Sequence, residues 1–191
     1  TRPDPVVVIG GGVAGLAAAT FVARSGRAVM LFERAAGLGG RAVTSESGGF
    51  RWNLGPHALY QGGAAERSLK EFGVAFTGGH PPTDSGVTIF EGALDRLPGG
   101  PRGLLATHLL SAREKEKLAA FLTSLPRIRL ERLRRTSVED WASNRFREPM
   151  LCRLVLALLR LSTYTNADDR FSAGAALSQL RDGLRGVWYL D

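Results

Sequence analysis

The chain has 191 residues, enough for one domain or one and a half, and its 44% hydrophobic and 23% charged residues are ordinary for a globular protein. The net charge of +7 does not indicate nucleic acid, because 22 of the 25 basic residues are arginine, a skew that GC-rich coding produces without any selected partner. The single cysteine, Cys152, excludes an internal disulfide, and the sequence has no CxxC pair or Cys/His set for a metal. We expect a buried thiol there and a reducing, cytoplasmic compartment.

The chain opens with the pattern of a β-α-β unit. A short β-branched run at 5–9 is typical of a fully buried parallel strand. Glycines follow at once, and the Ala- and Leu-rich stretch 13–24 predicts a helix that ends near 25–26. A second buried strand is predicted at 28–32. The whole unit has about 30 residues, the size expected of a right-handed crossover.

The middle of the chain is less regular. Glycine is dense and apolar periodicity is weak over 35–63, which predicts a long loop, and loops of that length are usually functional or disordered. A short helix is predicted at 66–72, and strands at 88–90 and 93–97 are predicted to form a hairpin around the Glu-Gly pair between them. The Pro- and Gly-rich stretch 97–103 is the best candidate for a domain boundary.

Beyond this boundary the pattern becomes helical. Ser111 and Glu114 form a capping box, in which the serine side chain accepts from the Glu114 amide while the glutamate reaches back. The helix that they begin should end at about Leu125. Three further helices are predicted to begin at 136–137, to cover 150–161 and to begin after Ser172. We therefore predict an α/β fold with a Rossmann-like parallel start, divided into 1–97 and a mainly helical 98–191.

The residues after the first strand form the pattern G-x-G-x-x-G, at Gly10, Gly12 and Gly15. Gly10 permits the tight turn from strand to helix, Gly12 lacks the Cβ that would block a pyrophosphate, and Gly15 lets the helix pack closely on the strands. Phosphates bound there would lie on free amides at the positive end of the helix. The position of the motif therefore predicts a dinucleotide site, with a glycine turn in an ordinary α/β domain as the alternative.

The second predicted strand is followed by an acidic residue, Glu33, which lies 18 residues after Gly15. This is close to the spacing of about 20 residues expected for the carboxylate that binds an adenosine ribose. A carboxylate accepts from both ribose hydroxyls and repels a 2′-phosphate, so Glu33 favours FAD or NAD over NADP. The neighbouring Arg34 weakens this exclusion slightly.

The segment that follows is Gly-Leu-Gly39-Gly40-Arg41, and the family resemblance that it completes favours FAD over NAD. Paired glycines let a backbone approach a phosphate, and a fixed guanidinium offsets its charge. With these motifs, the stretch 6–60 resembles the opening of the FAD-dependent amine oxidase superfamily, which includes monoamine oxidases, protoporphyrinogen oxidase and phytoene (carotenoid) desaturases. The resemblance implies that Gly39, Gly40 and Arg41 lie against the pyrophosphate and ribityl chain of FAD. A plain surface role for Arg41 is the alternative.

The resemblance also implies a loop that reaches the isoalloxazine ring, and its match here is Gly55-Pro56-His57. Such a segment is similar to the desaturase and protoporphyrinogen oxidase branches, whereas amine oxidases more often carry a second glycine where Pro56 stands. Two roles stay open for His57, a place near the flavin or a structural hydrogen bond. Trp52 is expected to pack rather than to form a stacking platform.

The region after 97 resembles the start of the family's substrate domain more loosely. The segments 161–166 and 172–176 are expected to line or support its cavity, with Tyr164 as the residue of most interest. Members of the family are more than twice as long, so the resemblance implies a fragment of an FAD-dependent oxidoreductase. Such an enzyme takes hydride from a substrate C–H, and the substrate is a polyene, a porphyrinogen or an amine. An NAD-binding dehydrogenase or reductase domain and a non-catalytic fragment are the alternatives, and no catalytic side chain is assigned.

One cluster of basic residues is relevant to the partners that the protein could bind. It consists of Arg127, Arg129, Arg132, Arg134 and Arg135. We expect a solvated face or a contact with other parts of a longer protein, with an acidic lipid surface as the alternative. The most apolar stretch, 150–161, is interrupted by arginines and is shorter than the ~20 residues that span a bilayer. The predicted partner is a small-molecule substrate, with apolar character left open, and not nucleic acid. The protein is predicted to be cytoplasmic, with peripheral membrane contact as an alternative.

Overall fold

The computed structural model describes residues 3–55, 57–81, 86–98 and 100–190. Contacts divide the chain into two compact units, Thr1–Gly79 with Trp188–Asp191, and His80–Val187. The predicted boundary at 97/98 concerns the roles of two domains in a longer protein, and it stays a prediction.

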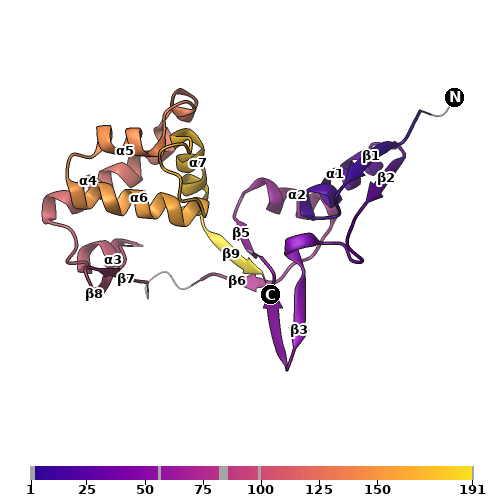
Figure 1. The fold of residues 1–191 in the computed structure, drawn as a ribbon, viewed down its shortest axis with the longest axis horizontal. Coiled ribbons are helices and arrows are strands. Elements are labelled where there is room, and N and C mark those ends of the chain that lie inside the picture. The colour runs from indigo at the N-terminus through magenta and orange to yellow at the C-terminus, as the bar shows by residue number, and fades with distance from the viewer. Residues whose placement is uncertain (1–2, 56, 82–85, 99, 191) are drawn as a thin grey trace. The chain divides into compact units, whose positions relative to one another are not determined.

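The first unit begins with the predicted β-α-β arrangement (Figure 1). It consists of β1 (Val6–Ile9), α1 (Val13–Arg24) and β2 (Val29–Phe32). The two strands are parallel, with Val6 opposite Val29 and Ile9 opposite Phe32. The helix ends as predicted, because Ser25 caps it and Gly26 has a φ of 79°. The prediction of a Rossmann-like α/β start is confirmed.

The burial predicted for these strands is wrong on one face of the sheet. Side chains alternate across a strand, and those on the face toward α1 are half-buried. The other face exposes four large apolar side chains: Val7 (54%), Ile9 (87%), Met30 (44%) and Phe32 (53%). Among the described residues nothing covers this face, so the β-branched run is buried on one side only.

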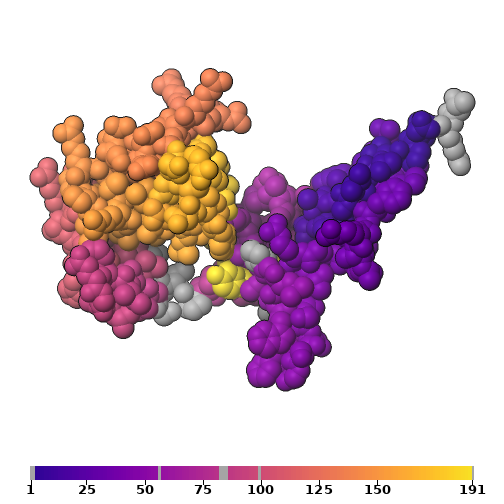
Figure 2. Space-filling model, in the orientation of Figure 1, coloured from indigo at the N-terminus to yellow at the C-terminus, as the bar shows by residue number. Residues whose placement is uncertain are grey.

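The long loop predicted over 35–63 is also wrong, because four short elements lie within it. These are η1 (Gly40–Ala42), β3 (Thr44–Ser47), β4 (Phe50–Asn53) and β5 (Ala58–Tyr60). The strands β3 and β4 form an antiparallel hairpin that projects from its unit (Figure 2). Gly48 and Gly49 make its two-residue turn with φ of 59° and 79°, the conformation that favours glycine at both positions. Every residue of both strands is exposed, so no apolar alternation marks them in the sequence.

The rest of the first unit supports the β-α-β start. Helix α2 (Ala64–Phe72) packs on α1 through a ring contact of 4.7 Å between Phe21 and Phe72. A three-stranded sheet has the order β5-β9-β6, with β6 at Gly78–Gly79 and β9 at Val187–Leu190. The helix predicted at 66–72 is confirmed, as is the strand at the end of the described chain.

The second unit begins with the predicted hairpin, β7 (Val87–Phe90) and β8 (Ala93–Arg96). Its turn residues Glu91 and Gly92 have φ of 50° and 80°, the left-handed values of a two-residue hairpin turn. The next element, α3 (Pro101–Ala106), lies within and beyond the Pro- and Gly-rich stretch, where no helix was predicted. Proline fits the first helical position because its missing N–H has no partner there.

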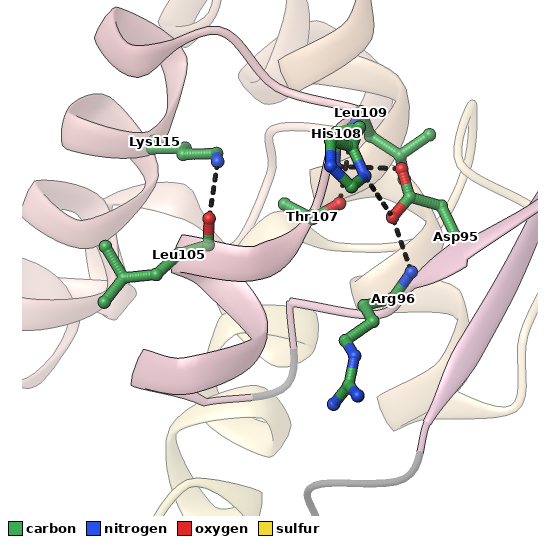
Figure 3. A network of polar contacts seen from close by, with 7 residues as sticks. All are labelled: Asp95, Arg96, Leu105, Thr107, His108, Leu109 and Lys115. Atoms are coloured by element: carbon green, nitrogen blue, oxygen red, sulfur yellow. Dashed lines mark hydrogen bonds and ion pairs between the residues drawn. The ribbon is translucent and has the colours of Figure 1, made fainter.

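Polar contacts tie this hairpin to the segment between α3 and the next helix, α4 (Ala112–Ser124) (Figure 3). The Asp95 carboxylate accepts from the amide of Arg96 at 2.6 Å and from the amide of His108 at 2.9 Å. A second contact joins the two helices that flank this segment: Lys115 of α4 donates to the carbonyl of Leu105 in α3 at 2.8 Å. Although burial opposes ionisation, these amides keep the pKa of Asp95 below its ordinary value.

Helices form the body of the second unit. They are α4 (Ala112–Ser124), η2 (Leu125–Arg127), η3 (Leu130–Leu133), α5 (Val138–Arg145), α6 (Pro149–Thr163) and α7 (Ala173–Gly183). The capping box at Ser111 is present, and Ser137 and Ser172 cap α5 and α7, so the predicted helix starts are confirmed. None of the described helices is both long and apolar enough to cross a membrane.

The core of the second unit is built around three aromatic rings. Phe121, Trp141 and Phe146 have ring centroids 5.4–5.7 Å apart, and leucine and valine side chains from α4, α6 and α7 surround them. Cys152 lies at the edge of this core and is half-buried. Burial raises the pKa of its thiol above the ordinary value, so the thiol stays protonated and unreactive at neutral pH.

Candidate functional site

The glycine turn, residues 10–15, joins β1 to α1 in a conformation that two of its glycines make possible. Gly10 has a φ of 100°, which side chains rarely adopt, and its amide donates to the carbonyl of Phe32 at 2.7 Å. A Cβ on Gly15 would lie 1.8 Å from the carbonyl oxygen of Gly10 and 3.5 Å from Val8. The contact with Gly10 therefore requires glycine at 15, in agreement with the close packing predicted from the sequence.

Gly12 differs from Gly10 and Gly15, because neither its backbone conformation nor its neighbours in the chain require glycine. It precedes α1 with extended backbone, φ −75° and ψ 178°, and a Cβ added to it would meet no described atom within 4 Å. No side chain caps the helix at this end, and its first turn holds no acidic residue. The amides at the positive end of a twelve-residue helix thus face open space, the arrangement that suits a phosphate.

Glu33 lies at the end of β2, beside the glycine turn. Its carboxylate accepts from the amide of Ala35 at 2.7 Å and from the amide of Gly11 at 2.6 Å. These two hydrogen bonds, that of Ala35 first, hold the pKa of Glu33 below its ordinary value. The side chain is therefore a fixed anion at neutral pH. Arg34, next to it, is exposed.

The second glycine loop, residues 37–41, lies directly against the glycine turn. The Gly39 amide donates to the Gly11 carbonyl at 2.8 Å, and Gly39 and Gly12 form an isolated parallel bridge. Gly39 and Gly40 have φ of 109° and 57°, and a Cβ on Gly40 would lie 3.3 Å from the Cα of Gly12. The structure therefore brings together two motifs that the sequence places 27 residues apart, counting from Gly12 to Gly39.

Arg41 and Gly55 meet at the far end of this loop. Arg41 is exposed within η1, and a Cβ on Gly55 would lie 2.6 Å from its carbonyl oxygen. Gly55 is thus a close-approach position, and its predicted place beside the cofactor stays a prediction. Pro56 lies outside the described residues.

His57 has a structural contact in the first unit. Its exposed ring lies 5.3 Å from the ring of Tyr189, and its carbonyl accepts from the amide of Leu190 at 3.0 Å. A role near a flavin stays a prediction for it. Trp52 does not pack in a core as expected: it is 56% exposed on β4, with its ring centroid 6.1 Å from that of Phe50.

Tyr164 lies in the second unit, where it ends α6 in the left-handed conformation with φ 52°. Its side chain is 70% exposed. The sequence reasoning missed the contributions of Gly11 and Ala35, whose backbone groups join Glu33 and the second glycine loop. A sequence signal for Gly11 was present, because glycine also occupies the variable second position of G-x-G-x-x-G. In the structure a Cβ on Gly11 would lie 2.5 Å from Leu38.

Comparison of sequences places the first part of the chain among dinucleotide-binding proteins. Residues 8–72 match the family described as NAD(P)-binding Rossmann-like domain. The chain is 41% identical over 70 residues to a carotenoid 3,4-desaturase of Haloarcula japonica, covering 37% of this chain and 14% of that protein. It is 54% identical over 56 residues to a phytoene dehydrogenase of Streptomyces griseus, covering 29% and 11%. The matched stretch is thus a small share of the length of these relatives.

Comparison of structures extends the similarity to nearly the whole chain. Putrescine oxidase bound to putrescine superposes with a TM-score of 0.71 at 21% identity, covering 97% of this chain and 45% of that one. At this identity the likeness shows the fold alone. Together the comparisons support the resemblance found in the sequence: the first part of the chain is similar to Rossmann-like NAD(P)-binding domains and to carotenoid and phytoene desaturating enzymes, and the described chain has the fold of part of putrescine oxidase.

Proposed function

We propose that the chain binds FAD and is part of an FAD-dependent oxidoreductase of the desaturase or oxidase type. The observation that carries the proposal is the contact between the two glycine loops, in which Gly39 and Gly40 lie against Gly11 and Gly12. This contact places two stretches of backbone without side chains beside the open N-terminus of α1. Such a surface admits a pyrophosphate closely and offers amides to it.

The described residues fit the adenosine and pyrophosphate parts of the cofactor. Each Glu33 oxygen accepts one amide hydrogen and keeps a lone pair for a ribose hydroxyl. Gly10, Gly12 and Gly15 shape the pyrophosphate site, and Arg41 would offset its charge. Gly55, Pro56 and His57 are proposed to lie toward the flavin ring, with Arg34 beside the ribose.

The relatives favour an apolar substrate over a polar one, because they are named for carotenoid and phytoene. The loop Gly39-Gly40-Arg41 favours FAD over NAD through the family resemblance found in the sequence. When bound, a flavin would accept a hydride from a substrate C–H. The residues of this chain would bind and orient the cofactor, with 1–97 in the FAD domain and 98–191 in a substrate domain. A porphyrinogen or an amine is the alternative substrate, the latter in view of the putrescine oxidase fold.

A visible absorption spectrum tests the cofactor, measured on the longest chain that the reading frame encodes after incubation with FAD and desalting. We expect the two-banded spectrum of an oxidised flavin, with FAD released on denaturation. A folded protein that stays colourless would contradict the proposal. If that protein binds NAD instead, a dehydrogenase or reductase domain replaces the flavoenzyme.

Two alanine substitutions in the glycine turn should affect different properties, one the binding of FAD and the other the stability of the fold. Gly12→Ala fits the backbone and meets no described atom, so the fold should keep its stability while FAD binding weakens by about tenfold or more, or about 1.4 kcal/mol. Gly15→Ala places a Cβ against the Gly10 carbonyl, so unfolding in urea should show a loss of about 3 kcal/mol.

Gly79→Ala is the matched control, because a Cβ there also meets no described atom within 4 Å and Gly79 lies on β6, outside both glycine loops. It should leave both stability and FAD affinity unchanged. Unaltered FAD binding by the Gly12→Ala protein would show that the cofactor lies elsewhere.

We also propose that the basic cluster contacts an acidic lipid surface. Arg127, Arg129, Arg132, Arg134 and Arg135 are all exposed, and within the described part of the chain their side chains have no ion pair or hydrogen bond. One arginine near an anionic bilayer contributes about 1 kcal/mol of binding. Unpaired guanidinium groups on one short segment suit such a surface.

Co-sedimentation with vesicles tests this contact. Vesicles of phosphatidylserine and phosphatidylcholine should bind the protein more strongly than pure phosphatidylcholine, and added salt should weaken the binding. Replacing Arg132 and Arg135 by glutamine should weaken it by about 2 kcal/mol. The same change at Arg27 and Arg153, exposed arginines outside the cluster, is the control. Equal binding to both kinds of vesicle would rule the contact out.

A further inference from the structure

The carboxylate of Glu33 is engaged on both oxygens by the backbone of its own chain. Oε2 accepts from the amide of Gly11, 22 residues earlier, at 2.6 Å, and Oε1 accepts from the amide of Ala35 at 2.7 Å. Hydrogen bonds from amides to an ionised acceptor are shorter and stronger than those between neutral groups. The side chain therefore links the glycine turn to the start of the segment that leads into the second glycine loop.

The peptide group of Gly11 carries this link onward. Its amide donates to Glu33, while its carbonyl accepts from the amide of Gly39 at 2.8 Å. Gly11 is buried, and a Cβ there would lie 3.2 Å from the Cβ of Glu33 and 2.5 Å from Leu38. Gly11 is thus enclosed between Glu33, Leu38 and the second loop. A continuous series of contacts runs from Ala35 through Glu33 and Gly11 to Gly39.

We propose that Glu33 is a positioning residue for both glycine loops, in addition to any contact that it makes with ribose. Its carboxylate fixes the Gly11 peptide, and this peptide in turn holds Gly39 against the turn where the pyrophosphate binds. The proposal rests on the proposed function for the identity of the ligand. The ordering of the two loops belongs to the chain alone and exists without ligand.

This role differs measurably from ribose binding alone. A glutamine at 33 keeps the size of the side chain but replaces one oxygen by an NH₂ group, which donates and does not accept. One of the two amides then loses its acceptor, and the remaining hydrogen bond loses its charge. If Glu33 only bound ribose, this substitution would not change the order of the two loops in the ligand-free protein.

Amide hydrogen exchange, followed residue by residue by NMR in the ligand-free chain, is the first test. In Glu33→Gln, the amides of Gly11, Ala35 and Gly39 should exchange about tenfold faster or more, while those of α4 to α7 stay unchanged. Glu116→Gln, a neutralised exposed glutamate on α4, is the matched control and should change none of the three. Unchanged exchange at Gly11 and Gly39 in Glu33→Gln overturns the proposal.

Binding of inorganic pyrophosphate, which has no ribose, is the second test. The proposal predicts that Glu33→Gln weakens pyrophosphate binding by about tenfold relative to the original chain and to Glu116→Gln. If FAD binding weakens while pyrophosphate binding does not, Glu33 acts through ribose only and the proposal fails. If the original chain binds neither ligand, the proposed function fails, and the exchange experiment alone decides the positioning role.

If Glu33→Gln does not fold, a second substitution at the same position tests the proposal. Glu33→Asp keeps the negative charge but is shorter by one methylene, so its carboxylate can still accept from Ala35, two residues on, but cannot also reach Gly11 in the same geometry. It should speed exchange at Gly11 and Gly39, and unchanged exchange at both positions would overturn the proposal.

Discussion

The site depends on the contact of one stretch of backbone with another, where a side chain on either would prevent it. Gly40 lies so close to Gly12 that a Cβ on it would be 3.3 Å from the Cα of Gly12, and Gly39 donates to Gly11 across the same contact. Two backbones at this distance leave a surface without side chains beside them. That surface, at the open end of α1, is the physical basis for placing a dinucleotide there.

The two units owe their stability to different features. The second unit has a core of aromatic and aliphatic side chains, with Phe121 fully buried, and serine caps begin three of its helices. The first unit has few buried side chains, and its parallel strands expose Ile9 and Phe32. Its order rests more on backbone hydrogen bonds, including those that Glu33 accepts. Substitutions that weaken these bonds should therefore affect the first unit more than the second.

The sequence predicted the elements whose signals are local. The β-branched run of β1, the uninterrupted α1 and the capping box at Ser111 each specify a structure through neighbouring residues. The hairpin of β3 and β4 escaped prediction because all its residues are exposed, so that apolar residues do not alternate, and the Gly48-Gly49 turn lay among many other glycines. Helix α3 was not predicted because the Pro and Gly residues around it are typical of a domain boundary.

The residues of the site were predictable as motifs, but their contacts were not. Spacing alone pointed to Gly10, Gly12, Gly15 and Glu33. That Glu33 accepts from Gly11, and that Gly39 meets Gly11, depends on how β2 returns beside β1, which is a tertiary feature. Gly55 illustrates the same limit, because its close approach to the backbone of Arg41 is visible only in three dimensions.

A titration of the isotopically labelled chain with ADP, the half of the cofactor that the described residues fit, tests the central claim most directly. NMR reports each glycine amide separately. We expect the amides of Gly11, Gly12, Gly39 and Gly40 to shift together, with one common dissociation constant, and those of the second unit not to shift. Shifts confined to one of the two loops, or centred on other residues, would contradict a shared dinucleotide site.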